Sequence, residues 1–129
     1  MNLSLRVFTL EVNSTSNSIT PHVRYISPDN VLKDLYRILN CEIVTCTGIE
    51  INDRHFDVWS DDEALLKNNP VPNLYIDDDL IIFGSLAFAK ADNDGRLVGL
   101  SRAEVHLLWD FAFKQFPKLL DFIARQKRR

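Results

Sequence analysis

Apolar and polar residues nearly alternate over residues 3–12 and again over residues 19–26, and the polar cluster NSTSNS separates the two stretches. This alternation is typical of β-strands and predicts an antiparallel pair. Pro21 has no amide hydrogen to donate to a neighbouring strand, so we expect the second strand either to lie at an edge of the sheet or to begin irregularly there. Residues 41–60 return to the strand pattern around a turn in IEIND and predict a second hairpin.

Helices are predicted from capping residues and from the spacing of apolar positions. Ser27 and Pro28 suit a helix start, because the hydroxyl can cap the helix and proline fits its first turn. Ser60 with Glu63 fits a capping box in front of a short helical turn, which the loop sequence NNPVPN then ends. The apolar stripe that follows Pro28 has helical spacing and consists of Val31, Leu32, Leu35, Ile38 and Leu39.

Residues 80–91 are the most apolar stretch and predict a strand near the middle of the sheet. The DNDG sequence at residues 92–95 suits either a calcium loop or a hairpin turn. A calcium loop with Gly95 at its sixth position has Lys90 at the first and Ser101 at the twelfth, where a carboxylate-type ligand and a glutamate are required. We therefore expect a hairpin turn, with residues 96–100 as the partner strand.

A second capping box, Ser101 with Glu104, predicts a helix that runs through Phe116. Pro117 marks a break there, followed by a second short helix or a kinked continuation. Together these elements predict an α+β fold, a single domain with a mostly antiparallel sheet of about five or six strands and the helices packed on one face. Residues 1–112 make the α+β core, and residues 113–129 make a C-terminal helical extension with a basic tail.

Composition and charge narrow the class of protein. A chain of 129 residues that is 46% apolar suits one compact domain. Its longest apolar run, residues 80–89, is about half the roughly 20 residues of a membrane helix. The net charge is −3, and subtracting the four positive charges of the last five residues leaves −7 for residues 1–124. Such an acidic body lacks the basic footprint of a nucleic-acid-binding face.

The N-terminus has no signal-peptide pattern, which favours the cytoplasm. Cys41 and Cys46 support this location, because in an extended strand they lie on opposite faces, roughly 16 Å apart, and do not pair.

The order of the elements resembles a known family. The features that carry the resemblance are a short N-terminal hairpin, the helix NVLKDLYRIL, the strand CEIV, an N-P-x-P-N loop and the segment IIFGSLAFAKADNDGRLVGLSRAEV. They are similar to a domain of unknown function common in phages, plasmids and integrated elements of Gram-positive bacteria, over about residues 3–112. The resemblance implies a mobile-element protein in a bacterial host cytoplasm, and the family has no established catalytic residues to carry over to this chain. The aromatic-rich segment from Phe111 onward departs from the family pattern.

Residues that could carry chemistry are few. His22, His55 and His106 are scattered, and no zinc-binding, Cys-x-x-Cys or phosphate-loop motif occurs, so we expect no metal and no cofactor. Asp57 lies two residues from His55 on one strand face, where the two could act as an acid and a base. Because no nucleophile or oxyanion donor accompanies them, the sequence predicts a protein that is not an enzyme.

Two candidate surfaces remain for binding. One is an acidic rim that is either a solvated edge or a docking surface for a basic partner; it consists of Asp61, Asp62, Glu63, Asp77, Asp78 and Asp79. The other arises because residues 105–123 hold more apolar side chains than one core can bury. Either two copies pack in a homodimer, or Pro117 folds the last helix back over the first. The candidate dimer surface is Trp109, Phe113, Phe116, Leu120 and Ile123.

From these features we expect a non-enzymatic interaction protein of a phage or mobile element. It binds an unidentified protein partner, forms a homodimer, and antagonises a host defence or nuclease system. Neither membrane association nor direct nucleic-acid binding is expected. The alternative is a module that sequesters a nucleotide-like small molecule. Converging basic and aromatic side chains in a pocket would favour that alternative, whereas an acidic or apolar surface patch would favour protein binding.

Overall fold

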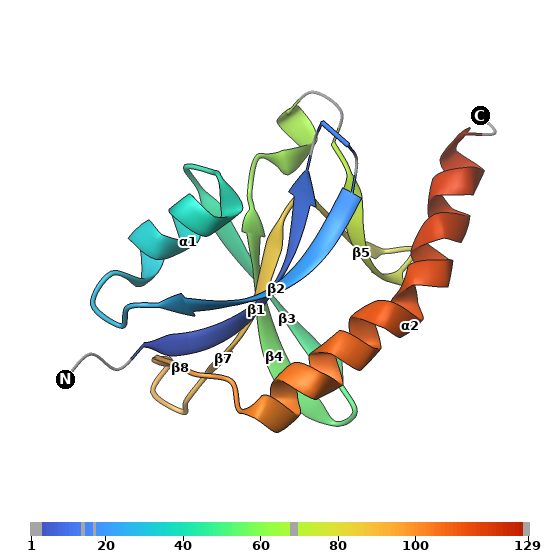
Figure 1. The fold of residues 1–129 in the computed structure, drawn as a ribbon. Coiled ribbons are helices and arrows are strands. Elements are labelled where there is room, and N and C mark those ends of the chain that lie inside the picture. The colour runs from blue at the N-terminus through green and yellow to red at the C-terminus, as the bar shows by residue number, and fades with distance from the viewer. Residues whose placement is uncertain (1–3, 14, 17, 68–69, 128–129) are drawn as a thin grey trace.

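The computed structural model describes residues 4–13, 15–16, 18–67 and 70–127. An antiparallel sheet of six strands organises the chain (Figure 1). Its strands are β1 (Leu5–Asn13), β2 (Ser18–Ile26), β3 (Val44–Ile51), β4 (Arg54–Asp61), β7 (Leu86–Ala91) and β8 (Leu97–Val98). They are ordered β2-β1-β7-β4-β3, with β8 paired to β7. The other elements are the hairpin β5 (Pro72–Asp77) and β6 (Leu80–Phe83), the helices α1 (Val31–Leu39) and α2 (Arg102–Lys127), and the 3-10 turn η1 (Ala64–Leu66).

This architecture confirms the predicted α+β class with its mostly antiparallel sheet. β2 lies at an edge, the first of the two alternatives that Pro21 predicted, and pairs with β1 along its whole length. The β3–β4 hairpin turns through Asn52 and Asp53, which have φ values of 51° and 64°. Two successive positive φ angles are typical of the type I′ turn, whose twist matches that of the flanking strands.

The predicted strand over residues 80–91 is two strands instead of one. Gly84 has a φ of +80°, a conformation that side-chain-bearing residues avoid, and the chain turns there from β6 into β7. β7 then takes the central position between β1 and β4, so the prediction of a central strand is confirmed for residues 86–91. β6 pairs instead with β5. This strand was not predicted, because the sequence NNPVPN, which overlaps its first two residues, is typical of a loop. Two register shifts make that hairpin irregular.

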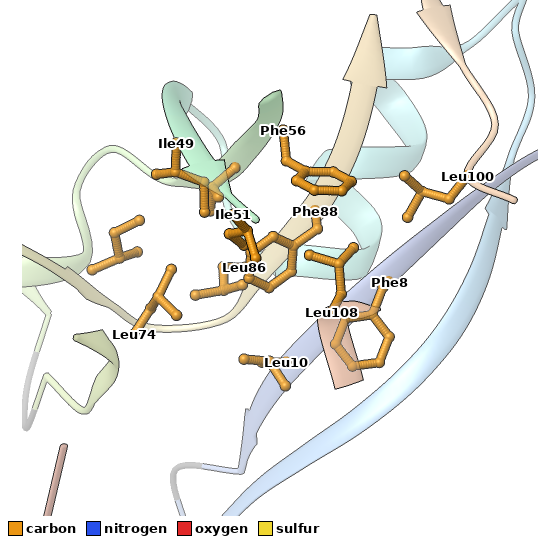
Figure 2. Close-up of a cluster of buried hydrophobic side chains, with 12 residues drawn as sticks. Phe8, Leu10, Ile49, Ile51, Phe56, Leu74, Leu86, Phe88, Leu100 and Leu108 are labelled. Carbon is orange, nitrogen blue, oxygen red and sulfur yellow. The ribbon is translucent and has the colours of Figure 1, made fainter. Parts of the chain in front are cut away.

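The helices cover opposite faces of the sheet, which corrects the prediction that both pack on one face (Figure 1). Alternate residues of a strand point to opposite faces, and in β7 both sets are apolar. Leu86 and Phe88 join the larger core cluster, which also holds Leu108 of α2 (Figure 2). Ala87 faces the other way and packs against Leu35 of α1. Because both faces of the central strand are apolar, each face needs a cover.

Two predicted helix caps do not form. α1 begins at Val31, with Asn30 at its N-cap and no side-chain cap hydrogen bond. The Ser27 hydroxyl oxygen accepts the Asp29 amide at 3.3 Å, and the Ser27 carbonyl accepts the Asn30 amide at 3.1 Å. Ser60 is buried within β4 and caps nothing.

The capping box of α2 forms as predicted. The Glu104 amide donates to Ser101 Oγ at 3.1 Å, and the Ser101 amide donates to Glu104 Oε1 at 2.8 Å. Lys90 Nζ also lies 3.0 Å from that carboxylate. Burial alone would raise the pKa of Glu104, but the hydrogen bonds from Ser101 and the charge of Lys90 hold it below its ordinary value.

α2 continues through Pro117 to Lys127, so of the two predicted alternatives the kinked continuation is confirmed and the separate second helix is wrong. A proline inside a helix removes one backbone hydrogen bond and bends the helix, and Figure 1 shows a change of direction partway along α2. Packing maintains the second half, since Gln115 Oε1 accepts the Tyr75 amide at 3.0 Å and Phe122 lies 5.7 Å from the Tyr75 ring. Among the described helices, none is long and apolar enough to cross a membrane.

Candidate functional site

α2 presents a stripe of large apolar side chains to solvent. Its exposed members are Trp109 (50%), Phe113 (76%), Phe116 (43%) and Leu120 (50%), and Ile123 is half-buried. Their spacing alternates between four and three residues, which places them on one face of the helix in the pattern of a coiled-coil seam. We call these five residues the apolar stripe. They are the candidate dimer residues of the sequence, and the structure brings them together on one helix.

The stripe stays outside because a neighbouring side of α2 packs against the rest of the chain. Leu108 and Leu119 are fully buried, and Gln115 is buried against β5. Since α2 does not fold back at Pro117, its second half does not cover its first half. The chain itself therefore leaves the stripe open over the described residues, and Phe113 is its most exposed member.

A groove of about 350 Å³ lies between the stripe and the β1–β2 hairpin. Among the described residues that line it, Gln115 has a polar side chain and Trp109 an indole N–H, and the others are apolar. Trp109 forms the link to the core, because its ring lies 6.0 Å from that of the buried Phe8. We call this hollow the apolar groove; its walls include Leu10, Ile19, Pro21, Trp109, Phe113 and Phe116. Sequence reasoning missed the strand side of the groove, because no local pattern shows that β2 lies beside α2.

The six carboxylates of the predicted acidic rim fall into two separate groups. Asp61, Asp62 and Glu63 lie next to η1, at the open end of the β5–β6 hairpin, where the Gly84 amide donates to Val71 O at 2.8 Å. Asp77, Asp78 and Asp79 lie at the closed end of the same hairpin. Five strand steps, roughly 17 Å, separate the two ends.

Several of these carboxylates are also engaged within the chain. Asp61 is buried, accepts the Glu63 amide at 2.9 Å and forms an ion pair with Lys67. Asp78 is exposed and accepts the Tyr75 hydroxyl, with Arg125 3.4 Å away. The Tyr75 hydrogen bond, aided by Arg125, holds the pKa of Asp78 below its ordinary value. The structure therefore does not bring the predicted acidic residues to one surface.

His55 and Asp57 do meet, on the β3–β4 hairpin, and Glu50 joins them. His55 Nδ1 lies 2.9 Å from Glu50 Oε1, and Nε2 lies 3.0 Å from Asp57 Oδ1. The hydrogen bonds to Glu50 and Asp57 raise the pKa of His55, since both carboxylates favour its charged form. The ring lies on Gly48, where a Cβ would stand 2.7 Å from His55 Cε1.

Cys46 is on the same face of this hairpin, yet it is poorly suited as a nucleophile for the histidine. Burial and the charge of Asp57 raise the pKa of its thiol, which disfavours the reactive thiolate. Both cysteines are free, and Cys41 precedes β3 instead of lying within a strand. Over the described residues, no three His, Cys, Asp or Glu side chains are grouped as metal ligands would be. The arrangement at His55 is best described as a cross-strand ion network.

The DNDG segment is the hairpin turn that the sequence predicted. Asp92 Oδ1 accepts the amides of Asp94 at 2.9 Å and Arg96 at 3.0 Å. Gly95 adopts a φ of +80°, and the β7–β8 pairing follows on either side of the turn. The Asp92 carboxylate therefore orders the backbone of this turn.

Fold and site together define an α+β domain with a helix on each face of its sheet and an exposed apolar stripe on the longer helix. The chain belongs to the family described as a domain of unknown function (DUF3846), whose model matches residues 10–112. Comparison with curated proteins and with solved structures gave no match. The matched segment ends within α2, so the stripe from Phe113 onward lies beyond it.

Proposed function

We propose that this chain is a protein-binding module, and that the apolar stripe with the apolar groove beside it is the binding face. The observation that carries the proposal is the set of four large apolar side chains, each 43–76% exposed, on one face of one helix. Soluble monomers rarely expose such a contiguous patch without a use for it. Burying each side chain against a partner is worth roughly 1.5–3 kcal/mol, so a few of them supply a substantial driving force.

We propose further that the partner is a host or phage protein, and that binding it antagonises a host defence or nuclease system. The resemblance to a family common in phages and plasmids supports this setting. The same setting makes the host's defence proteins the first partners to test. Binding through an apolar face requires no catalytic group on this chain, in keeping with a non-enzymatic role.

A second copy of the chain is the second candidate occupant of the stripe. The four-three spacing of the stripe suits the helix of another subunit, because it is the spacing that interlocks two helices. A homodimer of this kind is two-fold symmetric, with Phe113 and Phe116 at its centre. Light scattering at tens of micromolar tests it, and a monomer mass contradicts it.

The small-molecule alternative is favoured by a different observation. The described residues that line the apolar groove include no basic side chain to bind a phosphate, but a second hollow combines Arg6, Arg102 and His106 with Tyr25. Basic and aromatic groups of this kind suit a nucleotide-like ligand. Its volume of about 260 Å³ lies at the small end for such a ligand.

The test of protein binding is capture from a host lysate with matched variants. Phe113→Glu places a charge on the most exposed position of the stripe, and Leu66→Glu does the same at a residue of η1 that is 81% exposed. Proteins identified by mass spectrometry with the wild type should persist with Leu66→Glu and disappear with Phe113→Glu. If the same proteins are captured by both variants, the stripe is not the binding face.

A further inference from the structure

A second hollow, of opposite character, lies beside α2 on the N-terminal side of the apolar groove. Along α2 the stripe extends backward at the same four-three spacing, from Trp109 to His106 and then to Arg102. These two residues line the second hollow, of about 260 Å³, together with Arg6, Val23, Tyr25 and Val105. We call it the basic hollow.

The strand side of both hollows is one continuous row. Ile19 and Pro21 of β2 line the apolar groove, and Val23 and Tyr25 line the basic hollow. These are alternate residues, so they share one face of the strand. The two hollows therefore lie one after the other along the same two walls, β2 and α2, and we call them together the channel. From Arg102 to Phe116 the channel is ~21 Å long, at 1.5 Å per helical residue.

Arg6 is held in place at the basic end. Its Nη1 donates to Leu100 O at 3.1 Å, while the Leu100 amide donates back to Arg6 O at 2.9 Å. The guanidinium lies 5.9 Å from the centre of the Tyr25 ring, its partner across the strands. An arginine ordered in this way loses little freedom when an anion binds, because its position is already set.

The cationic side chains of the basic hollow are not paired with carboxylates of the described part of the chain. Over the described residues, Arg6, Arg102 and His106 have no carboxylate within the 4.0 Å of an ion pair, whereas Arg24, Lys67 and Lys90 each have one. In a chain with a net charge of −3, this end of the channel is left open to a negative group.

We propose that the channel binds a segment of a partner protein that is apolar along its length and carries carboxylates at one end. The apolar side chains lie in the groove beside Trp109 and Phe113, and the carboxylates lie at Arg6, Arg102 and His106. This inference rests on the proposed function. It adds the chemistry of the partner segment and the end of the channel at which its carboxylates lie. A nucleic acid fits less well, because the apolar groove gives a phosphate backbone no partner.

Charge also favours an acidic partner segment over a second copy of the chain as the occupant of the channel. If two α2 helices pack antiparallel about the midpoint between Phe113 and Phe116, Arg102 of each lies opposite Lys127 of the other. Parallel packing brings the two Arg102 side chains together. Both arrangements place like charges at the basic end, whereas an acidic segment places opposite charges there.

Four synthetic peptides of about 15 residues, roughly four helical turns, test the proposal. All carry leucines at four-three spacing. Two carry a pair of glutamates, one at its N-terminus and one at its C-terminus, and the other two carry a pair of glutamines at the same places. Fluorescence anisotropy with the full chain should show roughly three- to tenfold tighter binding of one glutamate peptide than of the matching glutamine peptide. Arg102→Glu should abolish that preference, and Lys33→Glu, an equal charge change on exposed α1, should leave it intact.

The outcomes separate this inference from the proposed function. Equal binding of the glutamate and glutamine peptides, or a preference for glutamate that survives Arg102→Glu, overturns the inference that the partner segment carries carboxylates at one end. In that case, loss of binding with Phe113→Glu still supports the stripe as a binding face. Failure of all the peptides to bind the wild type also overturns the inference. Capture from a host lysate then remains the test of the apolar stripe as a binding face. A third outcome is that ATP displaces the peptides from the wild type but not from Arg102→Glu, while glutamate and glutamine peptides bind equally. That outcome would assign the basic hollow to a nucleotide instead.

Discussion

Asn73 is the polar residue on which the position of the β5–β6 hairpin depends most. It is fully buried, and its Nδ2 donates to Leu10 O of β1 and to Gly84 O, both at 2.8 Å. Its own carbonyl accepts Gln115 Nε2 of α2 at 3.4 Å. Asn73 thus links the hairpin to the central sheet on one side and to the helix that carries the stripe on the other.

Asn73→Ala removes both side-chain hydrogen bonds, each of which contributes about 0.5–1.5 kcal/mol net. It leaves the Leu10 carbonyl without that partner in a buried site, and it also removes Asn73 Oδ1, a buried oxygen that has no hydrogen-bond partner among the described residues. An unsatisfied buried group costs about 1–3 kcal/mol, so these last two effects roughly cancel. We therefore expect a loss of about 1–3 kcal/mol in the free energy of unfolding. With a urea dependence of about 1.5 kcal/mol per molar, the midpoint falls by roughly 0.7–2 M.

Urea unfolding followed by tryptophan fluorescence measures this loss, with Asn93→Ala as the matched control. Asn93 is exposed in the β7–β8 turn, and its replacement should change the free energy by no more than about 0.5 kcal/mol. A loss below about 1 kcal/mol for Asn73→Ala would refute the reasoning. It would mean that water or a local shift satisfies the two carbonyls as well as the asparagine does.

Three further predictions concern the charged groups. Because its folded-state pKa is raised, the charged His55 contributes stability that is fully present below its unfolded pKa of about 6.5 and is lost as the pH rises through the folded value. The difference in urea midpoint between wild type and His55→Gln should therefore be larger at pH 5.5 than at pH 8.5, and a difference that grows with pH contradicts the ion network. Glu104 has a lowered pKa, so its stabilisation is present above the unfolded pKa of about 4.3 and is lost as the pH falls through the folded value. Glu104→Gln should consequently be less stable than the wild type at pH 7, with the gap closing on acidification; a constant gap would show that the charge is unimportant. Finally, calcium should leave the melting temperature unchanged in both the wild type and Asp92→Asn, and a calcium-dependent rise of several degrees would disprove the turn assignment.

The sequence alone determined the features that depend on neighbours along the chain. Alternation predicted the β1–β2 and β3–β4 hairpins, and the missing amide of Pro21 predicted that β2 is an edge strand or begins irregularly. The hydroxyl and carboxylate of Ser101 and Glu104 lie within one helical turn of each other, so their reciprocal bonds follow from spacing. The five residues of the apolar stripe were also singled out, because residues 105–123 hold more apolar side chains than one core can bury. Their place on one face of one helix follows from the continuation of α2 past Pro117.

Only the tertiary structure decided which surfaces meet. An apolar stripe requires a cover but does not specify which face of the sheet supplies it, so α1 and α2 were wrongly assigned to one face. Pro117 breaks an isolated helix, yet the packing of Gln115 and Phe122 on β5 maintains α2 beyond it. The channel beside α2 has its strand wall more than 75 residues away in the sequence, between Ile19 and Tyr25. Local patterns arise from the geometry of a few consecutive residues, whereas this channel exists only because distant segments bury their other faces in a common core.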